Sequence, residues 1–360
     1  MTADERTPRV SVVMAVHDGE RYIGAAVDSV LAQRFSDLEL IVVDDGSTDR
    51  SIAIVRERAD PRVRVITNGR NLGLAPSLNI GVGEARGEFV ARLDCDDVAM
   101  PQRLERQVAF MDANPDVALL GSWYVTMAED GTLGEPIQLP TRHWDLRWQL
   151  CIHCPFAHSA VLWRRRLVAE RIGAYDERLR FSEDYDFWWR ISAKLQVANL
   201  PESLLRLRTH PRSMTSTYGD LTRQGLRMQA AHAARLLGWP NDDERNETRL
   251  TRLYWMAVSR PRGLTQPELL DAAAEVLRLH DTFVADEGVP RAEADRQRRE
   301  LRARLARQLL SASRTAVADG RRGASRALLR SVLDLDPMAL LGRAGVDAGI
   351  GIAARVLGRS

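Results

Sequence analysis

Lysine is nearly absent from this sequence. Lys194 is the only lysine, and arginine supplies every other residue of the lysine and arginine total. The 51 basic residues are balanced by 49 acidic ones, which leaves a net charge of +2. Because a dedicated nucleic-acid-binding protein carries an excess of clustered basic residues, this balance argues against that function class. The preference for arginine indicates the codon usage of a GC-rich genome rather than a particular chemistry.

Long hydrophobic runs are also missing. No stretch reaches the roughly 18 apolar residues that a membrane-spanning helix needs. The first residues, Met1–Arg9, lack the apolar segment of a signal peptide. We therefore expect a soluble, cytoplasmic protein. With 360 residues, 45% of them hydrophobic, the chain has room for one large domain or two ordinary ones.

The cysteines are few, and three free thiols would fit a reducing compartment. Cys151 and Cys154 form a Cys-x-x-Cys pair, with His153 between them and His158 nearby. A zinc or redox site therefore has to be considered, although one such pair without a second is weak evidence for zinc. The sequence favours free, partly buried thiols, with a metal site as the alternative.

One short acidic stretch organises the chain. Asp94, Asp96 and Asp97 follow a mostly apolar run, Phe89–Leu93. Three carboxylates within four residues repel each other, so a compact site that holds them is usually stabilised by a cation. Hard oxygen ligands at the end of a buried strand indicate Mg²⁺ or Mn²⁺, bound together with a phosphate-bearing substrate. The alternative is a solvated acidic turn that caps the next helix.

The first hundred residues alternate between strand and helix patterns. Apolar, β-branched runs that predict buried strands are followed by segments with helical spacing, and this alternation predicts a parallel sheet. The predicted strands are Val10–Val16, Leu38–Val43, Val63–Ile66 and Glu88–Leu93. Asp44 and Asp45 end one of these strands, and the acidic stretch ends another. Since ligands of open α/β sheets bind at the carboxyl ends of the strands, both groups are expected at the ligand-binding edge.

The region from residue 101 to residue 218 mixes helices with an antiparallel element. We expect a helix over 101–113 and a hairpin beginning with Val117–Met127. A cluster of aromatic residues follows, which could belong to the hydrophobic core or could form the floor of a sugar-binding pocket. Glu183–Asp186 opens a further helix, where an ordinary acidic cap is the alternative to a functional role.

From about Asp220 the composition changes to helices rich in arginine, alanine and leucine. We expect a helical C-terminal domain over residues 219–360, with helices at 222–238, 246–259, 266–280, 291–313 and 321–334. The last stretch, Met338–Leu357, is rich in glycine and alanine with sparse arginine. It is compatible with a peripheral position on the inner face of the cell membrane or with a closing helix.

Four motifs stand in register over about residues 9–215: Ser11–Glu20, Val43–Asp49, Leu93–Asp97 and Ser182–Asp186. Together they resemble the family 2 glycosyltransferases. The resemblance implies a GT-A fold over residues 1–218, with a mostly parallel sheet flanked by helices. It also implies a nucleotide-sugar donor, by default with uridine, a divalent metal (Mn²⁺ or Mg²⁺), and inversion at the anomeric carbon.

The resemblance also implies roles for the donor side of the site. Asp45 matches the family aspartate that recognises the base of the nucleotide, and Ala15, His17 and Glu20 match positions that line the same pocket. His17 stands where the family often has tyrosine, and an imidazole can still stack on a base.

At the metal and the diphosphate, Asp94 and Asp96 match the Asp-x-Asp motif, in which the second aspartate touches the metal. His210 matches a segment that closes over the diphosphate and ligates the metal in relatives. Asp97 is expected to support the loop.

Asp184 matches the catalytic base, which takes the proton of the acceptor hydroxyl. His158 and Glu183 are expected near the acceptor. A single displacement needs one base and no nucleophile, in agreement with the lack of any convincing nucleophile motif.

Two other functions remain open at this stage. A nucleotidyltransferase also uses paired acids and a metal, but it typically begins with a glycine-rich basic phosphate loop, which this sequence lacks. A non-catalytic nucleotide-sugar-binding protein would not need a base. We expect a saccharide, a lipid-linked molecule or a small molecule as the acceptor, in the synthesis of bacterial polysaccharide or glycoconjugate.

Overall fold

The structure is a computed structural model, and it describes residues 7–213, 222–240, 242–259, 263–336 and 339. The chain divides into two compact units, Met1–Leu150 with Cys154–Gly225, and Cys151–His153 with Leu226–Ser360. The domain boundary predicted at residues 218 and 219 lies outside the described residues and stays a prediction. Most of the stretch 338–357 also lies outside them.

The first unit is built on the predicted parallel strands. The strands lie in the order β3-β2-β1-β4, and each neighbouring pair is parallel. Their bounds are β1 Val10–Val16, β2 Leu38–Asp44, β3 Val63–Thr67 and β4 Phe89–Arg92. Every residue of β2 and β4 is buried, as their continuous apolar patterns predict.

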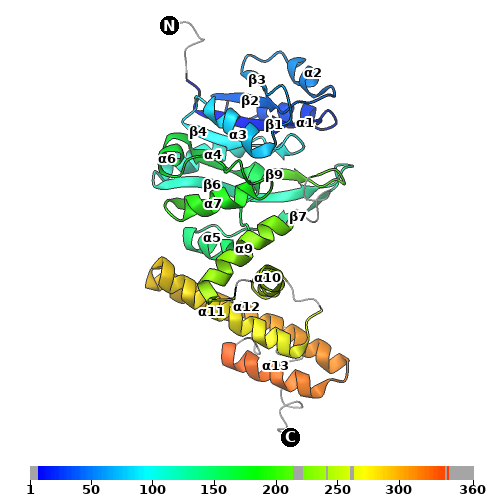
Figure 1. The fold of residues 1–360 in the computed structure, drawn as a ribbon, viewed down its shortest axis with the longest axis vertical. Helices are drawn as coiled ribbons and strands as arrows, with labels where there is room; N and C mark the ends of the chain where they lie inside the picture. Colours follow the sequence, from blue (N-terminus) through cyan, green and yellow to red (C-terminus); the bar gives the residue numbers. More distant parts are fainter. Residues whose placement is uncertain (1–6, 214–221, 241, 260–262, 337–338, 340–360) are drawn as a thin grey trace. The chain divides into compact units, whose positions relative to one another are not determined.

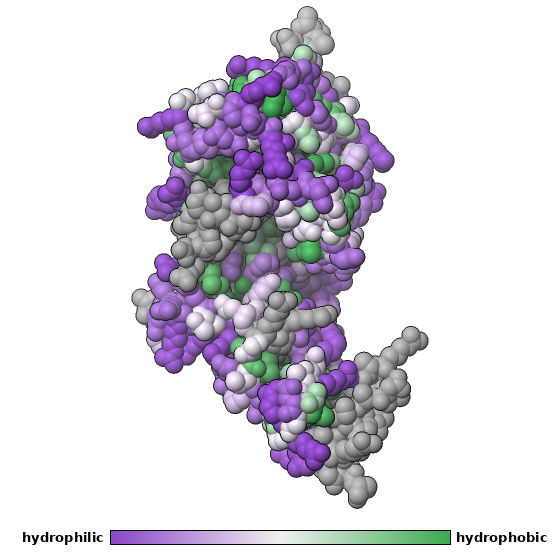
Figure 2. Space-filling model, turned by 90° about the vertical axis from the view of Figure 1, so that its right-hand side faces the viewer, coloured by the Kyte–Doolittle hydropathy of each residue, from purple (hydrophilic) through white to green (hydrophobic). Residues whose placement is uncertain are grey.

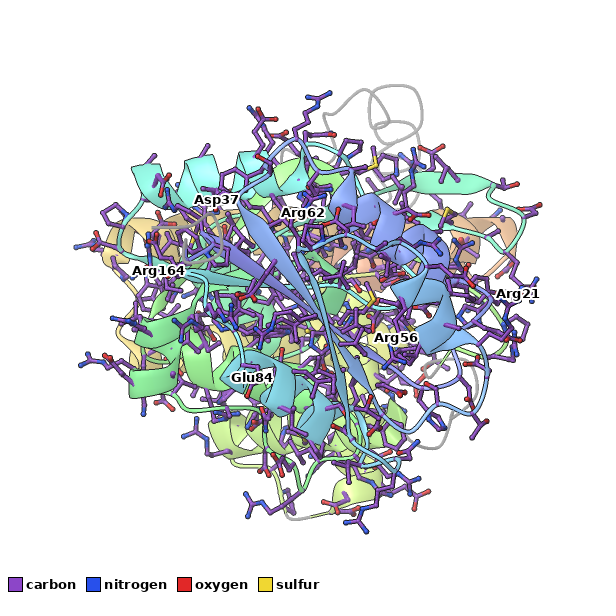
Figure 3. The ribbon with its side chains drawn as sticks, turned by 90° about the horizontal axis from the view of Figure 1, so that it is seen from above. Arg21, Asp37, Arg56, Arg62, Glu84 and Arg164 are labelled. Carbon is purple, nitrogen blue, oxygen red and sulfur yellow. The ribbon has the colours of Figure 1, made fainter. Side chains whose placement is uncertain are left out.

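Three helices connect these strands: α1 Ile23–Leu31, α2 Ser51–Arg56 and α3 Leu74–Gly83. The buried face of α1 carries Ile23, Val27 and Val30, which belong to the main core with the apolar side chains of β1 and β2. Glu84, labelled in Figure 3, follows α3 and pairs with Arg64 of β3 at 3.0 Å. The helices therefore hold the strands in parallel order and leave the carboxyl ends of the strands for other groups.

The sheet continues beyond β4 through strands that run in both directions, in the order β4-β8-β6-β9-β5. The predicted hairpin is confirmed, since β7 pairs with β6 in antiparallel fashion. The bounds are β5 Val98–Ala99, β6 Val117–Met127, β7 Leu133–Ile137, β8 Leu162–Arg164 and β9 Gln196–Arg208. The sheet is thus mixed, and it is flanked by helices (Figure 1).

Four further α-helices lie among the described residues of this unit: α4 Arg103–Ala113, α5 His143–Leu150, α6 Arg165–Arg171 and α7 Glu183–Ser192. The aromatic residues before and within α7 form one packed cluster. Trp163 and Trp188 are buried, with ring centroids 6.1 Å apart, and Tyr175 packs on Phe187 at 4.4 Å. These side chains are therefore core, and the cluster anchors the start of α7.

The second unit is helical. Its helices are α9 Thr222–Leu237, α10 Asp243–Ala257, α11 Gln266–Glu287, α12 Arg291–Ala318 and α13 Arg322–Leu335. α12 and α13 lie side by side (Figure 1). Among the residues that the structure describes, no helix is long and apolar enough to cross a membrane. The face of the molecule in Figure 2 is mostly hydrophilic, with small separate hydrophobic patches.

Candidate active site

Asp45 and the acidic stretch lie at the carboxyl edge of the parallel strands, as predicted. Val16 at the end of β1 lies opposite Asp44 at the end of β2, and Asp94 follows the end of β4 by two residues. The chain leaves the sheet at this edge in three loops. The edge therefore brings the three acidic or polar motifs of the first hundred residues together.

Asp45 is buried and anchors one of these loops. Its Oδ1 accepts hydrogen bonds from the backbone N–H of Leu72 at 2.8 Å and from Asn68 Nδ2 at 3.0 Å, and its Oδ2 accepts one from the N–H of Gly73 at 2.9 Å. Burial, the largest influence, raises the pKa of Asp45, but these donors outweigh it and leave the pKa lowered. The carboxylate is therefore a fixed negative group at the sheet edge.

The other expected donor residues lie around Asp45. His17 Nδ1 is 3.0 Å from the carbonyl oxygen of Asp45, while its ring is exposed. Ala15 lies in β1 opposite Val43. Glu20 is exposed and accepts a hydrogen bond from the N–H of Arg50 at 3.1 Å. The structure thus joins His17 to Asp45 directly, and Glu20, in the loop that follows β1, contacts the loop that follows β2.

The acidic stretch forms a compact group. Single ligand atoms of Asp94, Asp96 and Asp97 all lie within 4.8 Å of one another, and no other group of three potential metal ligands exists among the described residues. Cys95, Cys151 and Cys154 form no disulfide with one another. The predicted cation site therefore has a suitable donor set, and the zinc alternative for the Cys-x-x-Cys pair has no support in the described chain.

The three carboxylates have different partners. Asp94 forms an ion pair with the buried Arg92, and its Oδ2 accepts a hydrogen bond from the Ser159 hydroxyl at 2.7 Å. Asp97 is buried, and its Oδ1 accepts one from the N–H of Arg208 in β9 at 2.7 Å. Asp97 thus ties its loop to β9 and has the expected supporting position.

Asp96 is the carboxylate that faces a histidine. Its Oδ2 lies 3.0 Å from His210 Nε2. Burial and the charge of Asp94 raise the pKa of Asp96. The other ring nitrogen, His210 Nδ1, is buried and has no hydrogen-bond partner among the described residues. The sequence placed both residues at a metal, and the structure brings them into contact although 114 positions separate them.

Asp184 and Glu183 stand in the first turn of α7. Asp184 Oδ1 accepts a hydrogen bond from the N–H of Tyr185 at 2.7 Å. Burial raises the pKa of Asp184, and the charge of Asp94 adds to this. Glu183 is buried as well, and burial together with the charge of Asp184 raises its pKa to about 8. The acidic side chains at this end of the helix therefore keep a proton to a higher pH than an exposed carboxyl group does.

Known proteins give the family of this chain. The model of "Glycosyl transferase family 2" matches residues 11–173. The O-antigen biosynthesis glycosyltransferase WbnJ of Escherichia coli is 33% identical over 211 residues, which cover 57% of this chain and 81% of that protein. This chain belongs to glycosyl transferase family 2. It is accordingly a glycosyltransferase, as its motifs predict.

Solved structures confirm the fold of this glycosyltransferase. TarS of S. aureus in complex with UDP-GlcNAc has a TM-score of 0.53 and 19% identity, with 90% of this chain and 91% of that chain covered. The mannosyltransferase PcManGT of Pyrobaculum calidifontis, in complex with GDP-Man and Mn²⁺, has a TM-score of 0.50 and 16% identity, with 94% and 89% covered. The predicted GT-A fold is thereby confirmed.

Arg92 belongs to the candidate site of this glycosyltransferase, although no sequence motif assigned it a role. It is 1% exposed, and one of its amino groups donates to the Ser159 hydroxyl at 3.1 Å. A second buried arginine, Arg103, donates to the carbonyl oxygens of Arg92 and Val161 at 2.8 and 3.1 Å. An arginine inside an apolar strand pattern, directly before the acidic stretch, is the signal that could have revealed this buried cation.

His158 lies beside the glycosyltransferase's acidic pair. Its Nδ1 is 3.9 Å from Glu183 Oε1, and its Nε2 is 3.0 Å from the Tyr175 hydroxyl. Burial and the nearby charge of Arg92 hold the pKa of His158 well below its usual range, so the ring is neutral. His158 can therefore accept or donate a hydrogen bond next to Glu183, but it does not supply a positive charge.

Proposed function

We propose that this glycosyltransferase is an inverting, metal-dependent enzyme that moves a sugar from a nucleotide diphosphate donor to an acceptor hydroxyl. The observation that carries this proposal is that two acidic positions share one site. The charge of Asp94 raises the pKa of both Asp96, which faces His210, and Asp184, at the start of α7. A metal position and a base therefore lie within electrostatic reach of the same carboxylate.

The donor would bind over the ends of β1 and β2. We assign recognition of the base to Asp45, with His17 stacking on the ring and Ala15 and Glu20 lining the pocket. Support comes from Asp45, whose carboxylate is held in a fixed position by three donors. We propose a uridine donor because TarS, a structural neighbour, is in complex with UDP-GlcNAc. Asp94, fixed by Arg92, would orient the donor.

The donor atoms of Asp96 and His210 fit a divalent cation. A carboxylate oxygen and an imidazole nitrogen lie 3.0 Å apart. The carboxylate oxygen suits Mn²⁺ or Mg²⁺, and the imidazole nitrogen is the more usual ligand of a transition metal. Asp96 and His210 would hold the ion. When bound, the cation would neutralise the diphosphate that leaves the sugar. PcManGT, with Mn²⁺ in its complex, supports this assignment.

Asp184 would act as the base on the acceptor side. A raised pKa makes a carboxylate a stronger base, and a general base works best when its pKa approaches the operating pH. Glu183, with a pKa of about 8, keeps its proton at neutral pH. The negative charge of the pair is therefore left on Asp184, which can take the acceptor proton. Glu183 and His158 would line the acceptor side.

The acceptor is proposed to be a saccharide, a lipid-linked molecule or a small molecule, in the synthesis of polysaccharide or glycoconjugate. WbnJ, a relative named for O-antigen biosynthesis, supports a saccharide. We also propose that the enzyme works in the cytoplasm, since three cysteines that form no disulfide suit a reducing compartment. Residues 219–360 are proposed to form a separate helical domain.

The test is to incubate the protein with a panel of sugar nucleotides and candidate acceptors. Acceptor-dependent release of free nucleoside diphosphate is expected. Release of pyrophosphate would instead indicate a nucleotidyltransferase. Tight donor binding without any turnover over the whole panel would indicate a non-catalytic nucleotide-sugar-binding protein.

A further inference from the structure

Positive charge is concentrated in the last two described helices. Residues 291–335 contain twelve arginines and five acidic residues, a net charge of +7, although the whole chain carries only +2. The remainder of the chain is therefore negative. Such an asymmetry within one protein indicates contact with an anionic partner rather than a general need for solubility.

Most arginines of α12 are occupied within the protein. Arg296 pairs with Glu293 at 2.7 Å and with Glu300 at 3.0 Å. Arg302 and Arg304 donate to backbone carbonyl oxygens at the end of α13 and after α10. These side chains hold the helices together, so α12 contributes less free charge than its composition suggests.

The arginines of α13 are different. Arg322, Arg326 and Arg330 are spaced four residues apart and are exposed, and none has an ion pair or side-chain hydrogen bond within the described part of the chain. The opposite face buries Leu328 and Val332, among others. Residues four apart lie on one face of a helix, so the three guanidinium groups form a line on the order of 12 Å long. We call this line the arginine stripe.

Apolar groups continue beyond the arginine stripe. Leu333, 37% exposed, is one of four exposed large hydrophobic residues in the described part of the chain. The 24 residues after Asp336 contain three arginines and a single acidic residue, and most of the others are apolar or small. A soluble polyanion would need only the positive charge. A lipid surface uses both, because phosphate headgroups bind guanidinium groups while apolar side chains enter the interface.

We propose that α13 docks on an anionic phospholipid surface through the arginine stripe. Each basic side chain near such a surface adds to the attraction, and the flat surface offers phosphates along the whole line. The proposal does not depend on the donor, the metal or the base, since it concerns lipid binding and not turnover. It gives the arginine-rich helices a role besides packing.

The experiment measures co-sedimentation of the full-length protein with lipid vesicles. One set of vesicles contains phosphatidylcholine alone, and the other contains phosphatidylcholine with about a quarter of phosphatidylglycerol. Binding is expected only to the anionic set, and added salt should weaken it. The triple variant R322Q/R326Q/R330Q should lower the partition coefficient by a factor on the order of 10².

A matched control removes the same charge elsewhere. Arg56, labelled in Figure 3, Arg166 and Arg171 are exposed and have no side-chain partner within the described residues. R56Q/R166Q/R171Q should bind the vesicles like the wild type. A variant with lysine at the three stripe positions keeps the charge and should retain most of the binding. Equal melting temperatures would show that all these variants fold alike.

Three outcomes would overturn the proposal. The first is equal vesicle binding by the wild type and the stripe variant. The second is equal loss in the control variant, which would indicate net charge rather than the stripe. The third is a wild type that ignores both vesicle sets but is retained by immobilised polygalacturonate, which would indicate an acidic polysaccharide as the partner.

Discussion

The buried guanidinium of Arg92 forms an ion pair with the carboxylate of Asp94. Burial alone would raise the pKa of Asp94, but the charge and hydrogen bond of Arg92 lower it. The negative charge of Asp94 is therefore balanced by the protein itself. Asp97 is tied to β9, so Asp96 is the member of the acidic group that faces a potential metal ligand, His210. The three carboxylates consequently divide into two that other elements of the protein hold in place and one proposed metal ligand.

Replacing Arg92 with Met should destabilise the fold strongly. The variant leaves the partly exposed Asp94 without its charged partner, so the free energy of unfolding should fall, by at most the cost of breaking a fully buried ion pair from one side, about 3–5 kcal/mol. The measurement is the free energy of unfolding from urea titration.

The double variant R92M/D94N supplies the control, because it removes both charges. Its loss of stability should be smaller than the sum of the losses in R92M and D94N by more than about 1 kcal/mol. If the losses simply add, the two side chains do not act as a pair.

Mutations of the neighbouring residues Asp96 and Asp97 should have different effects on metal binding and on stability. D96A is expected to weaken Mn²⁺ binding, measured by calorimetry in the presence of UDP, and to reduce activity, because it removes a proposed ligand. D97A removes the acceptor for the N–H of Arg208 and should cost about 1–3 kcal/mol of stability. Excess chelator should reproduce the activity loss of D96A. Full activity under chelation would contradict the metal assignment.

The parallel half of the sheet could be predicted well from the sequence, because three of its four strands, β1, β2 and β4, are mostly apolar runs that lead into a polar motif. β9 could not be predicted in full. Pro201 and Glu202 interrupt its pattern, and the strand passes them only because its register against β6 shifts between Ser122 and Trp123. Tertiary pairing thus overrode local preference here.

The site was predictable to the extent that its residues stand in motifs. Asp45, Asp96 and Asp184 are marked by neighbouring acids or glycine, whereas Arg92 and Ser159 act through contacts between distant segments. Ser159 donates to Asp94 across 65 positions, and no local pattern encodes that contact. Residues that support a site from other elements therefore need the structure.

Stability should fall as the pH rises from about 5 to about 8, with a contribution from Glu183. Its pKa is raised from 4.5 to about 8 in the folded protein. Between these values the folded state binds more protons than the unfolded chain, so the free energy of unfolding decreases with pH. A difference of one bound proton changes the free energy of unfolding by about 1.4 kcal/mol per pH unit. The measurement is urea unfolding at several pH values, with chelator present.

The Gln variant at this position tests the assignment. Gln cannot ionise and has nearly the same size as protonated Glu183, so E183Q should gain stability relative to the wild type as the pH rises towards 8. Below pH 4.5 the two proteins should be similar. A constant difference across the range would show that Glu183 titrates normally.

Asp184 should be needed for turnover but not for donor binding. Asn keeps the size of the side chain and can still accept a hydrogen bond from the N–H of Tyr185, but it cannot take a proton. Loss of a positioned general base typically lowers the rate by about 10² to 10⁴. The expected result for D184N is a fall in kcat of that order, with a donor Kd close to that of the wild type.

The comparison with E183Q makes this result specific. Both substitutions replace one acidic side chain in the first turn of α7 with its amide, so any general effect on the turn should appear in both variants. Only Asp184 is assigned to the acceptor proton, and E183Q should therefore be milder. Kinetics and donor binding are measured for both variants at the same metal concentration. If D184N kept near-normal turnover, or lost donor binding in proportion to its activity, Asp184 would be a structural helix-end residue. The base would then have to be another group near Asp94.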